Sequence, residues 1–198
     1  MKKLTLSLLV LGWVGAVSLL LGILHSWHQA DLRPIKTDIP GLRSLLAQSL
    51  SDFNVVHFFT PTCSCSQVVM AQLLERQPLS ANGQAEVVVL LDDHGQEAAR
   101  QLREHGYQVL HLASPESGGE ASSLVSAVPL LVVFDGSGDV LYAGGYSDRT
   151  ITPFSQLDLQ EMIVRINSGD MPAPLPVRGC AVSRAYQEIL DPLGLKYG

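Results

Sequence analysis

Two cysteines lie close together in residues 60–66, a short polar segment that follows an apolar stretch and precedes an amphipathic one. Cys63 and Cys65 are therefore predicted at the turn between a strand and a helix. A thiol at a helix N-terminus faces unpaired N–H groups and the positive end of the helix dipole, and both favour the thiolate. The thiolate is the nucleophilic and metal-binding form of cysteine. This placement predicts a reactive or metal-binding site rather than a structural pair.

The spacing of these residues leaves two interpretations open. Cys63 and Ser66 form a Cys-x-x-Ser pattern, which is a single-thiol site that forms mixed disulfides, whereas Cys63 and Cys65 form Cys-x-Cys. Residues two apart on a helix lie about 200° apart around its axis, so a Cys63–Cys65 disulfide requires Cys63 to lie outside the first turn. Such a bond would be strained and easily reduced, as in an oxidant or isomerase.

The third cysteine, Cys180, lies in a proline-rich C-terminal segment. Four roles are open to Cys180. It would form a structural disulfide with Cys65, or it would resolve a disulfide or sulfenic acid on Cys63. Alternatively, it would complete a soft-metal site with Cys63 and Cys65, or remain a buried thiol. A Cys65–Cys180 bond would stabilise the domain by roughly 4–5 kcal/mol, because it closes a loop of more than about a hundred residues. The sequence does not choose among these roles.

The rest of the chain alternates between short apolar segments and amphipathic ones. Apolar, β-branched and aromatic segments predict strands at residues 54–59, 85–91, 107–112, 129–134 and 140–143. Apolar positions at helical spacing predict helices at residues 67–77, 95–105 and 152–169, with shorter ones at 41–50, between 115 and 126, and at 185–190. Asp92-Asp93 is expected to cap the second helix and Thr152-Pro153 to open the third. This alternation predicts an α/β sandwich with a mostly parallel sheet and an antiparallel edge pair.

The N-terminus carries a membrane signal. Lys2 and Lys3 precede residues 4–24, which contain no charged residue. This run spans roughly 31 Å as a helix, close to the hydrocarbon thickness of a bilayer. It is longer than the apolar region of a signal peptide, and the residues after it offer a poor small-x-small cleavage site, so an uncleaved anchor is expected. Because the lysines stay in the cytoplasm, the rest of the chain is expected outside the inner membrane.

The charge composition of the chain argues against one class of binding partner. The chain carries 13 Lys plus Arg against 19 Asp plus Glu, a formal net charge of −6. Nucleic acid is therefore not expected as a partner, because phosphate binding needs a basic face. The predicted organisation is a membrane anchor at residues 1–26, a tether at 27–40, an α/β domain at 41–169 and a proline-rich tail at 170–198.

From residue 54 to residue 169 the chain resembles the thioredoxin-like superfamily. The resemblance is carried by VVHFFTPTC, the following helix and strand–helix segments, AVPLLVVFDGSGDVLYAGGY and a closing helix. It implies a three-layer sandwich with a central mixed sheet, preceded here by one transmembrane helix. The segment between residues 107 and 126 looks like the insertion of membrane-tethered, periplasmic thiol-disulfide members. Val128-Pro129 looks like the family's cis-proline, which implies a place beside Cys63 in the peptide-binding groove.

The resemblance also assigns expected roles near the site. Cys63 matches the first cysteine of the family's Cys-x-x-Cys, while Ser66 stands at the second position. His57, six residues before Cys63, stands where many members carry a buried acidic or polar side chain. It would accept the thiol proton, ligate a metal, or act as a hydrogen-bonded core residue.

The resulting function hypothesis is a membrane-anchored thiol-disulfide oxidoreductase without a cofactor, acting on thiols or disulfides of periplasmic proteins. Cys63 would attack, Val128-Pro129 would hold the substrate strand, and Cys65 or Cys180 would resolve the mixed disulfide. The alternatives are a copper or zinc protein that uses the three cysteines, and a redox-inactive interaction module. A peroxidase ranks third, after the metal protein and ahead of the redox-inactive module, because Thr60 to Cys63 matches Thr-x-x-Cys but Val56 stands where a proline is expected.

Overall fold

The structure, a computed structural model, describes residues 2–29, 51–79, 83–91, 95–112, 125–191 and 194–195. Several expectations fall partly or wholly outside these residues, among them the tether at 27–40, the short helix at 41–50, the cap formed by Asp92-Asp93, the short helix between 115 and 126, and the insertion at 107–126.

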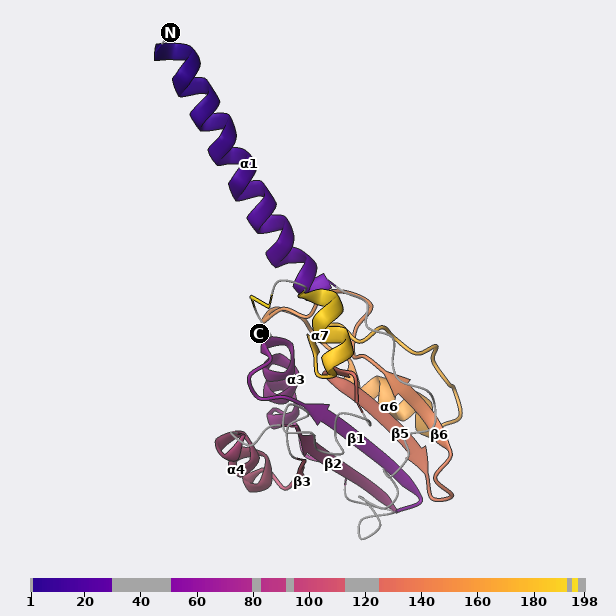
Figure 1. The fold of residues 1–198 in the computed structure, drawn as a ribbon. Helices are drawn as coiled ribbons and strands as arrows, with labels where there is room; N and C mark the ends of the chain where they lie inside the picture. Colours follow the sequence, from indigo (N-terminus) through magenta and orange to yellow (C-terminus); the bar gives the residue numbers. More distant parts are fainter. Residues whose placement is uncertain are drawn as a thin grey trace.

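The N-terminal segment forms one long helix, α1 (Lys2–Gln29), that projects away from the α/β body (Figure 1). Its stretch Thr5–Ile23 has a mean hydropathy of 2.3, and none of it is buried against the rest of the chain. Among the described residues, α1 alone is long and apolar enough to cross a membrane. The predicted N-terminal helix is therefore confirmed as a candidate membrane span, by its length and composition.

Five strands form the central sheet in the order β3-β2-β1-β5-β6. They are β1 (Phe53–Phe59), β2 (Gln84–Leu90), β3 (Gln108–His111), β5 (Leu130–Asp135) and β6 (Val140–Gly144). β1 pairs parallel with β2 and β2 with β3, whereas β5 runs antiparallel to both β1 and β6. The sheet is therefore mixed, with an antiparallel pair at one edge. The predicted thioredoxin-like α/β fold is confirmed.

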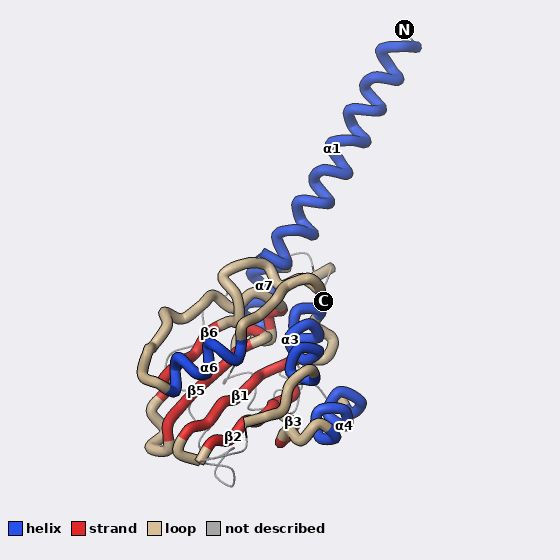
Figure 2. Tube along the Cα trace, turned by 180° about the vertical axis from the view of Figure 1, so that it is seen from behind, coloured by secondary structure: helices blue, strands red, loops and turns tan. Residues whose placement is uncertain are grey.

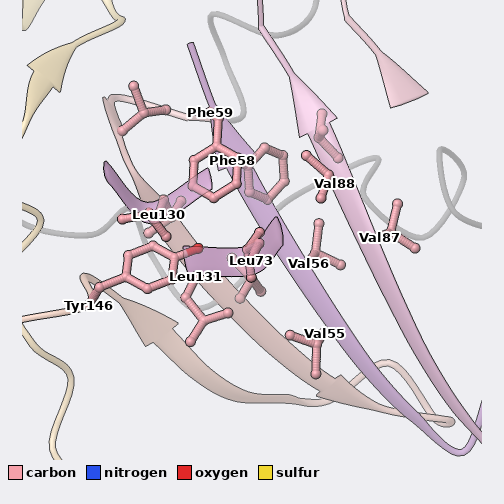
Figure 3. Packing of buried hydrophobic residues seen from close by; sticks show 14 of the residues in the cluster. Val55, Val56, Phe58, Phe59, Leu73, Val87, Val88, Leu130, Leu131 and Tyr146 are labelled. Carbon is pink, nitrogen blue, oxygen red and sulfur yellow. The ribbon is translucent and has the colours of Figure 1, made fainter. Parts of the chain in front are cut away.

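The central position of β1 explains its composition. All seven of its residues are buried, because helices or loops cover both of its faces and strands flank both of its edges. β1 contributes Val55, Val56, Phe58 and Phe59 to the core, and β2 and β5 contribute a second set that includes Val87, Val88 and Leu131 (Figure 3). The rigid end of this packed strand fixes where the chain enters the cysteine turn.

Helices α3 (Ser64–Leu74) and α6 (Leu159–Asn167) lie on the same face of the sheet, and α4 (Gln96–Glu104) lies beside β3 (Figure 2). α3 begins three residues earlier than predicted, because Cys63 acts as its N-cap. α4 has Gly95 as its N-cap.

The prediction that Thr152-Pro153 opens a helix is wrong. Thr152 and Ser155 close a local turn instead, with the Thr152 N–H donating to Ser155 Oγ at 2.9 Å. Hydroxyl side chains that bond nearby backbone in this way favour turns over helix. α6 starts at Leu159, where the Asp158 side chain accepts a hydrogen bond from the Glu161 N–H.

The C-terminal tail adds a second sheet that the sequence did not predict. β4 (Ala127–Val128) pairs antiparallel with β7 (Cys180–Ala181), and α7 (Arg184–Leu190) follows, as expected near 185–190. The tail is anchored before β7 as well, because the Gly145 N–H donates to Leu175 O at 2.8 Å. Strands of two residues show no alternation, so composition gave no signal for them.

Candidate active site

Cys63 lies at the junction of β1 and α3. Its N–H donates to Thr60 O at 2.9 Å and closes a turn, and its carbonyl accepts the first helical hydrogen bond from Gln67 N at 3.0 Å. Its backbone is extended, with φ −83° and ψ 120°, so Cys63 lies just outside the first turn of α3. This is the arrangement that a Cys63–Cys65 disulfide would require. Cys63, Cys65 and Cys180 are not joined by disulfides in the structure.

The sulfur of Cys63 is surrounded by donors that favour its ionised form. Hydrogen bonds from the thiols of Cys180 and Cys65 hold the Cys63 pKa well below its usual range, against the opposing effect of burial. The N–H and the hydroxyl of Ser66, in the first turn of α3, add to this lowering of the pKa. The predicted reactive thiolate therefore has a physical basis.

The structure brings Cys180 to Cys63 through the second sheet. Residue Cys180 on β7 is paired with Val128 on β4, and the Val128-Pro129 peptide bond is cis. The side chain of Cys180 reaches the Cys63 sulfur from this position. Cys63, Cys65, Cys180 and Val128-Pro129, predicted from separate parts of the sequence, thus meet at one place.

Cys65 and Ser66 both lie within the first turn of α3 and are buried. The Cys65 thiol also faces the carbonyl of Ile151, at 3.9 Å. The Ser66 hydroxyl has no hydrogen-bond partner of ordinary geometry among the described groups. It lies close enough to Cys63 to contribute to the lowered pKa of that thiol.

His57, on β1, lies in a buried hydrogen-bond network with Tyr146, Glu86 and Arg76. Its Nδ1 lies 2.7 Å from Tyr146 Oη, and its Nε2 lies 2.7 Å from Glu86 Oε1. Glu86 also accepts hydrogen bonds from Arg76 and, at 2.8 Å, from the Leu79 N–H. Both ring nitrogens are occupied, so His57 makes no hydrogen bond to Cys63 and takes the role of a hydrogen-bonded core residue.

The charges in this network follow from its partners. A carboxylate only accepts hydrogen bonds, so His57 Nε2 carries the proton toward Glu86, and a neutral ring then accepts from the Tyr146 hydroxyl. Burial lowers the His57 pKa, with Arg76 adding to this and Glu86 opposing it, which keeps the ring neutral. Burial by itself would raise the Glu86 pKa, but His57 and Arg76 outweigh it and lower the pKa to about 2.

The sequence analysis missed Glu86, Arg76 and Tyr146. A signal for Glu86 was present, because it is a charged residue inside the apolar run 85–91, and a buried charge has to be paired. Its partners come from other segments: Arg76 follows α3, and Tyr146 follows β6. Figure 3 shows the Tyr146 ring in the same buried cluster as Leu130 and Leu131 of β5.

The soft-metal alternative would require Cys63, Cys65 and Cys180 to surround one ion. Within the described part of the chain, no group of three His, Cys, Asp or Glu side chains is arranged to hold a metal ion.

A groove of about 840 Å³ opens beside the cysteine turn, between α3 and residues 151–157. Gln67, Gln72 and Ile151 line it, and Phe154, 93% exposed, stands at its rim.

Comparison with solved structures relates this fold to known ones. An uncharacterized conserved protein from Geobacillus kaustophilus matches with a TM-score of 0.52 at 19% identity, covering 70% of this chain and 80% of that chain. A hypothetical protein from Sinorhizobium meliloti matches with a TM-score of 0.50 at 17% identity, covering 70% and 82%. A candidate thioredoxin from Neisseria meningitidis matches with a TM-score of 0.43 at 15% identity, covering 62% and 77%.

At such low identities these likenesses concern the fold alone. No curated protein matches the sequence. The family described as "Domain of unknown function (DUF6436)" matches residues 37–175, which is more than half of the chain and includes the cysteine turn and the Val128-Pro129 segment. This chain therefore belongs to the DUF6436 family.

Proposed function

We propose that this protein is a membrane-anchored thiol-disulfide oxidoreductase that uses Cys63 as its nucleophile. The observation that carries the proposal is the environment of the Cys63 sulfur. It lies at the N-terminus of α3 and receives hydrogen bonds from Cys180 and Cys65, so its pKa is lowered. A thiolate held in this way is the species that attacks a disulfide.

The reaction consists of two exchanges. The Cys63 thiolate attacks one sulfur of a protein disulfide, a new S–S bond forms to Cys63, and the other substrate sulfur leaves as a thiolate. A second thiol then attacks Cys63 and releases the bound substrate sulfur as a thiolate. The substrate gains two electrons and the protein's two thiols become a disulfide, which an external dithiol reduces. In reverse, the same steps oxidise a substrate dithiol.

The proposed location is the periplasmic side of the inner membrane. Lys2 and Lys3 are the first two residues of α1, and positive charges at the end of a membrane helix stay in the cytoplasm. The α/β domain that follows would then lie in an oxidising compartment, where disulfides of other proteins are available as substrates. Periplasmic proteins with accessible disulfides or thiols are therefore the proposed partners.

A single-thiol variant tests the activity. In the full-length Cys65→Ser/Cys180→Ser protein, Cys63 has no internal partner, so it is expected to form a stable mixed disulfide with a peptide that contains one disulfide. Intact-mass spectrometry measures this adduct. The matched control carries Cys63→Ser as well and is expected to form none. A Cys63 thiol that forms no adduct, or forms one no faster than free glutathione does, would refute the proposal.

A further inference from the structure

The C-terminal strand β7 covers the edge of the segment beside the nucleophile. It runs antiparallel to β4, with Ala181 opposite Ala127 and Cys180 opposite Val128. The contact is close, because a Cβ atom added to Gly179 would lie 2.0 Å from the Val128 carbonyl oxygen. Only glycine fits at this position without displacing the backbone. The chain's own tail therefore occupies the main-chain edge next to the cis-proline.

The same tail places a sulfur on the nucleophile. The Cys180 side chain hydrogen-bonds to Cys63, and only 2% of Cys63 is exposed. A disulfide of another protein cannot reach a sulfur buried to this extent. The closed arrangement thus holds Cys63 ionised and inaccessible at the same time.

Hydrogen bonds hold the tail on both sides of β7. After β7, the N–H groups of Val182 and Ser183 donate to Ser126 O at 2.8 and 3.1 Å. Before β7, Arg178 Nε donates to Asp148 O at 3.2 Å. The paired part is only two residues long, so little main-chain pairing is lost when it opens.

We propose that β7 occupies the main-chain edge of β4 at Val128 to which a substrate strand binds. In this proposal β7 competes with the substrate for that edge, and its return brings Cys180 back to resolve the mixed disulfide. This inference rests on the proposed function. β7 shows which kind of segment binds this edge of β4: an extended antiparallel segment in which a glycine precedes a cysteine. The proposed substrate class is accordingly an extended Gly-Cys segment whose cysteine is in a disulfide.

Each step of the proposed cycle exchanges one disulfide bond for another. Substrate displaces β7 and the Cys63 thiolate forms a mixed disulfide, with release of the first substrate thiolate. When β7 returns, the Cys180 thiol loses its proton and attacks the Cys63 sulfur, the Cys63–Cys180 bond forms, and the second substrate sulfur leaves and takes up a proton. An external dithiol reduces the Cys63–Cys180 disulfide and restores both thiols. Cys65 stays reduced throughout.

The resolving role is tested by two single variants of the full-length protein. Each is mixed with a peptide that carries a Gly-Cys disulfide, and the products are measured by intact-mass and disulfide-mapping spectrometry. Cys180→Ser is expected to retain the peptide on Cys63, whereas Cys65→Ser is expected to release it and to end as a Cys63–Cys180 disulfide. Retention by Cys65→Ser together with release by Cys180→Ser overturns the inference while leaving the proposed function intact. Absence of any adduct in either variant and in the single-thiol variant refutes the proposed function itself.

The competition is tested by loosening β7. Gly179→Val places a side chain against the Val128 carbonyl, so the alkylation rate of Cys63 by iodoacetamide is expected to rise at least about tenfold. Ala173→Val, an exposed position in the same tail, is the matched control and is expected to leave the rate unchanged. Circular dichroism verifies that both variants are folded. An alkylation rate in folded Gly179→Val equal to that of the original protein overturns the competition, and Cys180→Ser tests the resolving role independently of any change in folding.

Discussion

Replacing Cys63 with serine is expected to lower the rate of disulfide exchange by at least about three orders of magnitude. A serine hydroxyl is not ionised at neutral pH, so the hydrogen bonds that stabilise the Cys63 thiolate have no anion to stabilise in the variant. The measurement is the steady-state reduction of a peptide disulfide by the full-length protein with a dithiol as electron donor.

The size of this effect is interpretable only if the fold is retained. Serine is close to cysteine in volume, and the variant keeps the backbone that caps α3, so its thermal unfolding should stay near that of the original protein. Ser168→Ala, an exposed position at the end of α6, serves as the activity control and is expected to keep full activity. If the Cys63→Ser protein still turned over substrate, another thiol would have to be the nucleophile.

Replacing Glu86 with glutamine is expected to reduce the free energy of unfolding by about 3 kcal/mol at neutral pH. Glu86 is buried and accepts hydrogen bonds from His57 and Arg76, and the neutral amide leaves Arg76 without its counter-charge. Chemical denaturation of the two proteins measures the difference. Glu97→Gln is the matched control, because Glu97 pairs with Arg100 on the exposed face of α4 and its loss is expected to cost little.

The effect of Glu86→Gln is expected to depend on pH. The Glu86 pKa is lowered to about 2 in the folded state, below its ordinary value of 4.5. The ionised carboxylate therefore contributes its full stability above about pH 4.5, and this contribution is lost as the pH falls from there toward about 2. The difference between the two proteins should shrink over the same range. A difference independent of pH would show that packing, not charge, sets the cost.

The fold was predictable because its main signals are local. The apolar runs that became β1, β2 and β5 are continuous, which is typical of strands buried on both faces. The position of Cys63 followed in the same way, from a β-branched and aromatic strand that ends just before the turn and an amphipathic segment that begins just after it.

What escaped prediction depends on contacts between distant segments. The pairing of Cys180 with Val128 joins residues 52 positions apart through a strand of two residues, which leaves no pattern in the sequence. The His57–Glu86–Arg76–Tyr146 network assembles from four segments in the same manner. The end of α6 was placed well by its apolar spacing, but its start was not, because hydroxyl groups at Thr152 and Ser155 form a turn where a helix start was expected.

The central claim is that the Cys63 sulfur is ionised in the folded protein at a pH where an ordinary thiol is not. It is tested most directly by titrating the ultraviolet absorbance of thiolate in the full-length protein, with Cys63→Ser as the reference, because this readout does not require a reagent to reach the buried sulfur. The difference between the two titrations is expected to show a midpoint several pH units below about 8.5, the value of a free cysteine. A midpoint at or above that value would contradict the account.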